Sequence, residues 1–133
     1  FNDRVAIVTG AGRGLGREHA LFLAARGAKV IVNDSSSEHA TATANDIVER
    51  GGIAIADTHS VADPEAAHEA VQTALNEFGA LHIVLNNAGR GGPTGTIEQT
   101  TDQQVATIIS THLVGSYNMS RAAWPHFRQQ QYM

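Results

Sequence analysis

Four short apolar runs recur along the chain, and a segment of helical periodicity follows each of them. The runs are rich in Val, Ile and Ala, and they cover residues 4–9, 29–33, 52–57 and 81–86. Apolar runs with little polar alternation are typical of strands that are buried on both faces of a sheet. We therefore predict four buried strands, each followed by a helix.

Apolar residues spaced three or four positions apart predict helices over residues 15–26, 38–50, 64–78 and 101 to about 125. Asp63 and Pro64 suit the N-cap and the first position of the third helix. Thr101 and Gln104 can form a capping box at the start of the fourth helix. Pro125 is expected to stop or kink that helix, because proline lacks a backbone amide.

Alternating strands and helices predict an α/β fold in which helices cover both faces of a parallel sheet. Right-handed crossovers then give a doubly wound Rossmann sheet with the strand order 3-2-1-4. Because the chain has 133 residues, we assign residues 1–133 to one domain. The later strands of such a sheet are absent from the chain, so we expect this domain to be incomplete at its C-terminal side.

Composition and charge narrow the classes of function. The formal net charge of -4 argues against nucleic-acid binding, which usually needs a basic surface. The chain has no Cys and no His pair in an H-E-x-x-H pattern, so we predict no disulfide and no metal site. No apolar run approaches 18 residues, so we expect no membrane-spanning helix. The lack of Cys is compatible with a reducing compartment, and we expect a cytoplasmic protein.

The first predicted strand leads into its helix through the glycine-rich turn Thr9-Gly10-Ala11-Gly12-Arg13-Gly14-Leu15-Gly16. Gly10 would allow a tight exit from the strand, Gly14 a close approach of a pyrophosphate, and Gly16 close packing of the helix. The helix N-terminus offers free N–H groups to phosphates. An ordinary glycine-rich turn is the alternative, but the strand before it and the helix after it favour nucleotide binding.

Asp34, at the end of the second predicted strand, is the candidate for ribose recognition. Its carboxylate can accept hydrogen bonds from both ribose hydroxyls and would repel a 2'-phosphate, which favours NAD over NADP. Arg13 favours the opposite choice if its guanidinium pairs with a 2'-phosphate, although it can equally be a solvated turn residue. A helix-capping or turn aspartate is the structural alternative for Asp34.

The spacing T-G-x-x-x-G-x-G, together with Asn86-Asn87-Ala88-Gly89 after the fourth strand, resembles the short-chain dehydrogenase/reductase family. The resemblance covers the whole chain, although an Asn pair can also be a simple turn-former. The stretches H-L-V-G-S at 112–116 and R-A-A-W at 121–124 look like the dehydrogenase domain of peroxisomal multifunctional enzymes, which act on 3-hydroxyacyl-CoA. The family implies a homo-oligomeric, NAD(P)-dependent enzyme that transfers a hydride between nicotinamide and a secondary alcohol or ketone, and Asp34 favours NAD as its cofactor.

The family also implies which residues of this chain contact the cofactor. Ser60 and Val61 stand where members commonly carry an Asp-Val pair beside the adenine, so Ser60 would bind the adenine edge without a charge. The complete set of predicted cofactor contacts is Gly10, Arg13, Gly14, Leu15, Gly16, Asp34, Ser60, Val61, Asn87, Ala88 and Gly89.

Two departures from the family concern catalysis. His112 stands where the family has a catalytic Asn, so it either holds a water in a proton relay or is a packed helix histidine. We expect the other six histidines to be surface or structural residues. The catalytic Ser and the Tyr-x-x-x-Lys pair of the family are missing from this chain, which we expect to be inactive by itself and to be part of a larger protein.

Two other classes of function remain open at this point. One is a nucleotide-binding or scaffold domain without catalytic activity, which would share the glycine-rich turn and Asp34. The other is a methyltransferase-like α/β domain, in which an acidic residue after the second strand also binds ribose; the Asn-Asn-Ala-Gly motif argues against it. The sequence specifies neither the substrate nor the number of subunits.

Overall fold

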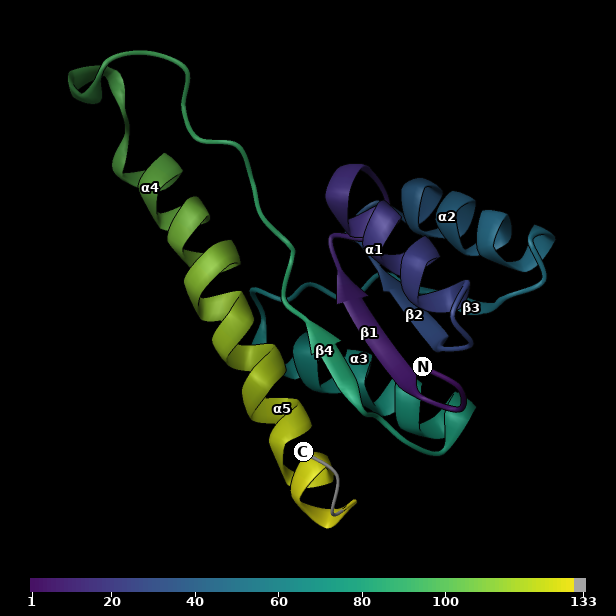
Figure 1. The fold of residues 1–133 in the computed structure, drawn as a ribbon. Helices are drawn as coiled ribbons and strands as arrows, with labels where there is room; N and C mark the ends of the chain where they lie inside the picture. Colours follow the sequence, from purple (N-terminus) through teal and green to yellow (C-terminus); the bar gives the residue numbers. More distant parts are fainter. Residues whose placement is uncertain (131–133) are drawn as a thin grey trace.

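The computed structural model describes residues 1–130 and contains a parallel sheet with helices on both faces (Figure 1). The strands run in the order β3-β2-β1-β4, which confirms the predicted doubly wound α/β fold. The strands are β1 (Val5–Thr9), β2 (Lys29–Asn33), β3 (Ile53–Asp57) and β4 (Ile83–Leu85). The helices are α1 (Gly14–Ala24), α2 (Ser37–Glu49), α3 (Pro64–Phe78), α4 (Asp102–Ile109) and α5 (Gly115–Gln129).

Two apolar clusters hold the helices against the sheet, one on each face. In β1, Ala6 and Val8 belong to the cluster under α1 and α2, whereas Val5 and Ile7 belong to the cluster under α3 and α5. This division follows from the alternation of side chains along a strand. The helices contribute mainly alanines to these clusters, and small side chains let a helix lie close to the sheet.

The predicted helix caps are confirmed. The Asp63 carboxylate accepts a hydrogen bond from Ala66 N at 2.9 Å, and Pro64 occupies the first position of α3. Thr101 and Gln104 form the reciprocal capping box of α4: Thr101 N donates to Gln104 Oε1 at 2.9 Å, and Gln104 N donates to Thr101 Oγ1 at 3.2 Å. Local sequence signals therefore place these helix starts correctly.

The fourth predicted helix differs from the expectation in two ways. It is divided into α4 and α5 by a π-helical segment, Ser110–Val114, that the sequence did not predict. Pro125 does not end the helix, since α5 continues to Gln129. Proline leaves the carbonyl of the residue four positions earlier without its helical amide, but Arg121 and Pro125 are both exposed, so water can reach that carbonyl. Ala123 and Phe127, on either side of Pro125, pack on the core and hold the helix in place.

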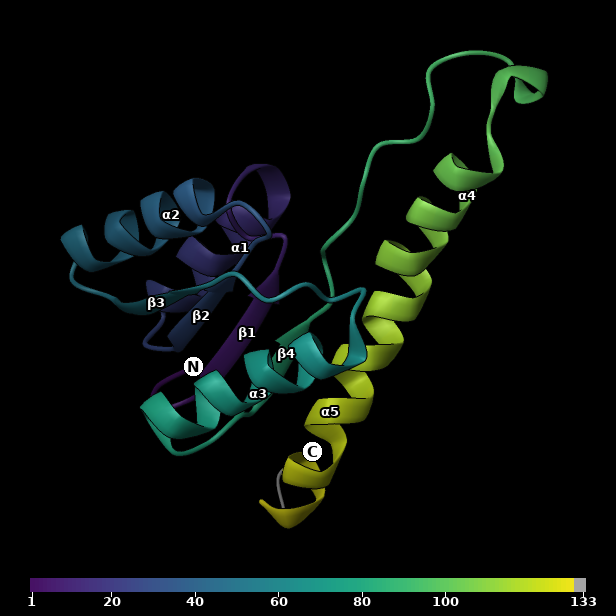
Figure 2. The same ribbon diagram turned by 180° about the vertical axis from the view of Figure 1, so that it is seen from behind.

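The chain between β4 and α5 projects beyond the carboxyl ends of the strands (Figures 1 and 2). Residues 86–101 run outward as a loop that ends in the short 3-10 helix Ile97–Gln99, and α4 leads back from there towards the sheet. Several large apolar side chains on α4, the π-helical segment and α5 are exposed, namely Val105, Ile109, Leu113, Tyr117 and Trp124. No helix within residues 1–130 is both long enough and apolar enough to cross a membrane.

A hydroxyl group connects the carboxyl ends of β1 and β4. Thr9, which is 1% exposed, donates through Oγ1 to Leu85 O at 3.2 Å. The same oxygen accepts from Asn87 N at 3.0 Å and from Ala88 N at 2.9 Å. In return, Asn87 Nδ2 donates to Thr9 O at 2.9 Å and to Gly10 O at 3.2 Å. These five bonds fix the turn after β1 relative to the turn after β4.

At the amino ends of β1 and β4, a histidine ring extends the hydrogen bonding between the two strands. Val5 N donates to His82 Nδ1 at 3.0 Å, and His82 N donates to Val5 O at 2.9 Å. Nδ1 must be unprotonated to accept this bond. Burial, and secondarily the positive charge of Arg4, lowers the pKa of His82 from its ordinary value of 6.5.

The substitution Thr9→Val should destabilise the fold by about 1–3 kcal/mol, because Val preserves the shape but leaves the amides of Asn87 and Ala88 without their acceptor. Urea unfolding measures this loss. Thr107→Val is the matched control, because within residues 1–130 the Thr107 hydroxyl bonds only to Gln103 of its own helix, donating to Gln103 O and accepting from Gln103 Nε2. Equal effects of the two substitutions would show that the Thr9 hydroxyl does not hold the strand ends.

Stability should fall as His82 becomes protonated. Because the folded state lowers the pKa of His82, the unfolded state binds the proton more readily, and stability is highest above pH 6.5. It decreases as the pH falls from there through the folded-state pKa. His82→Gln keeps an acceptor for Val5 N but does not titrate, so its melting temperature should depend less on pH between 8 and 5. His68→Gln, on the exposed side of α3, should follow the unsubstituted protein; parallel curves for all three proteins would contradict this role of His82.

Candidate functional site

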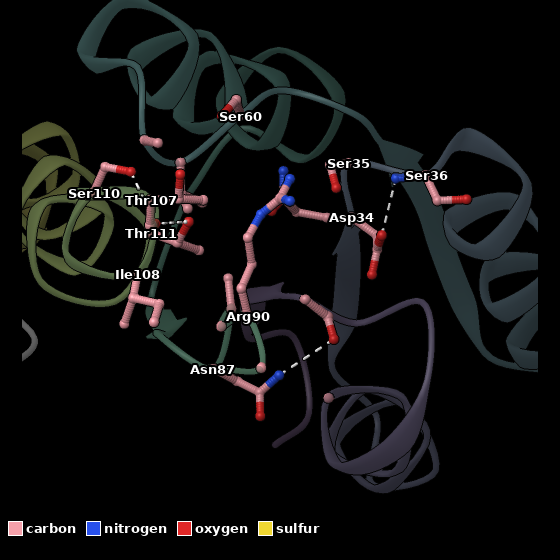
Figure 3. Close-up of a pocket in the computed structure, with 18 of the residues that line it drawn as sticks. Asp34, Ser35, Ser36, Ser60, Asn87, Arg90, Thr107, Ile108, Ser110 and Thr111 are labelled. Carbon is pink, nitrogen blue, oxygen red and sulfur yellow. Dashed lines mark hydrogen bonds between the residues drawn. The ribbon is translucent and has the colours of Figure 1, made fainter. Parts of the chain in front are cut away.

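A cleft of about 1090 Å³ lies at the carboxyl ends of the four strands (Figure 3). The turns after β1, β2, β3 and β4 form its floor and walls, and α4 contributes Thr107 and Ile108 at one side. In an open α/β sheet, ligands bind at this edge, where the connections on either side of the first strand run in opposite directions. The fold therefore places the cleft where a ligand site is expected.

All eleven residues that the sequence predicts as cofactor contacts line this one cleft. They come from four separate turns that the fold brings together. They are Gly10, Arg13, Gly14, Leu15, Gly16, Asp34, Ser60, Val61, Asn87, Ala88 and Gly89. The predicted catalytic residue His112 is not among the residues that line the cleft.

The N-terminus of α1 opens into the cleft without a side-chain cap. Arg13 occupies the N-cap position but makes no capping hydrogen bond, and the first turn of α1 contains no acidic residue. By contrast, Ser36, Asp63 and Thr101 each cap their helix with a side-chain oxygen. A side chain built onto Gly14 would meet no atom within 4 Å. The amide groups of this turn are therefore accessible to an anion, which the partial positive charge of the helix N-terminus would attract.

Two glycines allow the close contacts on which this turn depends. A Cβ at Gly16 would collide with the carbonyl oxygen of Gly10 and would lie 2.5 Å from Asn87 Nδ2, which confirms that α1 sits directly against the strand ends. A Cβ at Gly12 would lie 2.7 Å from Asp34 Oδ2. No role was predicted for Gly12, because its contact with Asp34 depends on how the turn after β1 meets the end of β2.

Asp34 is both a turn aspartate and a cleft residue. Its Oδ2 accepts a hydrogen bond from Gly12 N at 3.0 Å. Its Oδ1 accepts a hydrogen bond from Ser36 N at 2.9 Å, which Figure 3 shows. The two bonds fix the carboxylate between the glycine-rich turn and the start of α2. Each carboxylate oxygen can accept more than one bond, so the group can still accept hydrogen bonds from a ligand. The structural alternative for Asp34 and its predicted binding role are thus compatible.

The Asn pair after β4 connects three elements. Asn87 binds the end of β1 as described above, and Asn86 Nδ2 donates to Ser120 Oγ in α5 at 3.2 Å. Asn87 thus ties the ends of β1 and β4 together, whereas Asn86 ties β4 to a helix. The amide donors of Asn87 are used inside the protein, and these bonds fix the backbone that leads into Ala88 and Gly89.

His112 lies in the π-helical segment, and its ring contacts the turn that follows β4. Its Nε2 lies 2.9 Å from Arg90 N and 3.0 Å from Arg90 O, and a Cβ at Gly89 would lie 2.6 Å from the ring. The ring supports the backbone at Gly89 and Arg90, although His112 itself is exposed. A water-holding role in proton transfer stays a prediction.

The sequence analysis missed several residues that line the cleft. His39 and His59 do so, from the partly exposed positions that were expected of them. Arg90 extends its side chain from the end of β4 into the cleft (Figure 3). The signal for His59 and Arg90 was their position just after a strand, because the carboxyl ends of parallel strands meet at one edge. No group of three or more metal-ligating side chains occurs within residues 1–130.

Comparison with known proteins gives close similarities over almost the whole chain. The chain is 45% identical to the short-chain type dehydrogenase/reductase Rv0148 of Mycobacterium tuberculosis, over 98% of the chain and 48% of that protein. It is 41% identical to the peroxisomal multifunctional enzyme type 2 of mouse, over 99% of the chain and 19% of that enzyme. The chain thus spans half or less of the length of these relatives.

A solved structure shows the same fold. The crystal structure of a short chain dehydrogenase from Mycobacterium avium superposes with a TM-score of 0.90 and 38% identity, over 96% of this chain and 47% of that one. Residues 4–132 also match the sequence profile of the short chain dehydrogenase family. The cleft at the strand ends, the sequence similarities and this profile match together show that the chain belongs to the short-chain dehydrogenase family.

Proposed function

We propose that the protein is an NAD-dependent oxidoreductase that transfers a hydride between nicotinamide and a secondary alcohol or ketone. One observation carries this proposal: the uncapped N-terminus of α1 and the fixed carboxylate of Asp34 lie in the same cleft. The first provides donors for a diphosphate, and the second provides acceptors for ribose hydroxyls. Membership of an oxidoreductase family supports the reaction class.

The residues of the cleft fit a dinucleotide along its length. The turn from Gly10 to Gly16 would hold the diphosphate, Asp34 the adenosine ribose, and Ser60 and Val61 the adenine. Ala88 and Gly89 would lie along the cofactor on the side of β4. When bound, the dinucleotide supplies the hydride acceptor or donor, while these residues orient it.

The proposal favours NAD over NADP because of the position of Asp34. A 2'-phosphate beside this carboxylate would bring two negative groups together, at a cost that Arg13 would have to offset. Arg13 is exposed, whereas two backbone amides hold Asp34 at the end of β2. The fixed carboxylate therefore outweighs the exposed guanidinium in this proposal.

Assembly and location are proposed on less specific grounds. The exposed apolar side chains along α4 and α5 support the proposal that the protein is a homo-oligomer. A cytoplasmic location remains a prediction from composition. The similarity to peroxisomal multifunctional enzymes supports the inclusion of hydroxyacyl thioesters among the candidate substrates.

The test of the proposed function combines binding with turnover in the full-length protein. Calorimetry with NAD and NADP should give saturable binding, tighter for NAD, and a panel of secondary alcohols, including 3-hydroxyacyl thioesters, should give turnover followed by absorbance of the reduced nicotinamide. Binding without turnover of any substrate would favour the alternative of a non-catalytic nucleotide-binding domain. Absence of binding to both dinucleotides would contradict the proposal.

The substitution Asp34→Asn should weaken NAD binding by about 10- to 100-fold, because hydrogen bonds to a charged group contribute about 1.5–3 kcal/mol. NADP binding should change less, so that the preference for NAD decreases. Asp63→Asn is the control, because asparagine caps helices as well as aspartate does and Asp63 lies outside the cleft. An unchanged NAD preference in Asp34→Asn would show that Asp34 does not bind the ribose.

A further inference from the structure

A buried carboxylate orients a histidine at the edge of the cleft. Asp57, the last residue of β3, is 4% exposed, and its Oδ1 lies 2.7 Å from Nδ1 of His59. The carboxylate is also bound by Asn33 Nδ2 at 2.6 Å, by His59 N at 3.3 Å and by Thr73 Oγ1 at 3.4 Å. Donors from β2, α3 and the turn after β3 thus fix the position of the carboxylate, and the carboxylate fixes the ring of His59.

The contact with Asp57 determines which nitrogen of His59 carries a hydrogen. A carboxylate can only accept, so Nδ1 is the donor of this pair. In the neutral ring Nε2 is then an acceptor, as in other histidines oriented by a carboxylate. Within residues 1–130, Nε2 has no hydrogen-bond partner. The His59 side chain is 42% exposed and lines the cleft, so Nε2 is available to a ligand.

The backbone places His59 directly beside the predicted ribose site. Asn33 Nδ2 donates to His59 O at 2.8 Å, which holds the turn after β3 against the end of β2. Asp34 N donates to Asp57 O at 3.0 Å, so the ribose candidate and the carboxylate that orients His59 belong to adjacent strand ends. A nucleotide with its diphosphate at the turn after β1 and its ribose at the end of β2 directs its base towards the end of β3.

We propose that His59 recognises the 6-amino group of the adenine ring by accepting a hydrogen bond at Nε2, and that Asp57 is the positioning residue that presents this lone pair. A 6-oxo purine offers an acceptor instead of a donor at the same place, so the site discriminates against it. This inference rests on the proposed function, since it requires a dinucleotide in the cleft. It adds a base-specific contact beside Ser60 and Val61.

The test compares NAD with nicotinamide hypoxanthine dinucleotide, in which a 6-oxo group replaces the 6-amino group and N1 of the purine carries a hydrogen, while the rest of the molecule is unchanged. Dissociation constants are measured by calorimetry on the full-length protein at pH 8.5, where an ordinary imidazole is neutral. The unsubstituted protein should bind NAD about three- to tenfold more tightly, as expected for one hydrogen bond at a partly exposed site. His59→Ala should bring this ratio close to one.

Three further variants make the result specific. His59→Gln keeps a polar side chain that can present either a donor or an acceptor, so its ratio should also approach one if His59→Ala does not fold. Asp57→Asn can donate to Nδ1, which moves the hydrogen to Nε2, and its ratio should fall below that of the unsubstituted protein. His39→Ala, the matched control, removes another histidine from the same cleft and should keep the original ratio.

The outcomes separate this inference from the proposed function. Tight binding of NAD with a ratio of one in the unsubstituted protein, or an unchanged ratio in folded His59→Ala and His59→Gln, overturns the role of His59 and leaves the proposed function intact. Failure of the unsubstituted protein to bind any nicotinamide dinucleotide overturns both.

Discussion

The arrangement of the site depends on the close contact between the turn that follows β1 and the turn that follows β4. A Cβ on Gly16 would collide with the carbonyl oxygen of Gly10, and a Cβ on Gly10 would lie 2.8 Å from Ala88 Cα. The side-chain amide of Asn87 donates to both Thr9 O and Gly10 O. The Thr9 hydroxyl joins the same two turns by accepting hydrogen bonds from Asn87 N and Ala88 N. Because the amides of α1 and the backbone after β4 share this one fixed point, the cleft between them has a defined shape.

The charges of the cleft are arranged around the same junction. Asp34 is held on one side by Gly12 N, so the carboxylate cannot move without the turn that carries the free amides. Asp57, at the end of the neighbouring strand β3, is buried, and its carboxylate oxygens are hydrogen-bonded to Asn33, His59 and Thr73. One carboxylate therefore faces the cleft, whereas the other is enclosed and acts through its neighbour. Aspartates at the ends of adjacent strands thus have different roles because their surroundings differ.

Sequence patterns were sufficient for the sheet and for most of the cleft. Strand order follows from alternation and handedness, and the glycine-rich turn and Asp34 follow from spacing along the chain, since both are local properties. The contacts of Gly12 and His39 could not be read in this way, and the position of His59 just after a strand indicated the cleft but not the contact with Asp57. They depend on contacts between strand ends that are far apart in the sequence, which become visible only when the sheet is assembled.

The final helix shows a different limit of sequence reasoning. Helical periodicity indicated one continuous helix, and it contains no signal for a widened turn, because all residues from Ser110 to Val114 are compatible with an ordinary helix. Pro125 predicted the end or a kink of the helix, but the helix continues past it, because residues on both sides of Pro125 pack on the core. Tertiary contacts therefore determine the course of this helix more than its local sequence does.

The π-helical segment also has a consequence for comparing this protein with others. A π-turn accommodates one residue more than an α-helical turn, so the side chains after it are rotated by about 100° relative to a regular helix. A related protein without the widened turn would need a one-residue gap between α4 and α5 to keep Asn118 and Met119 facing the core. Superposition of coordinates, rather than ungapped alignment of letters, is then the sound basis for deciding which residue of a relative corresponds to His112.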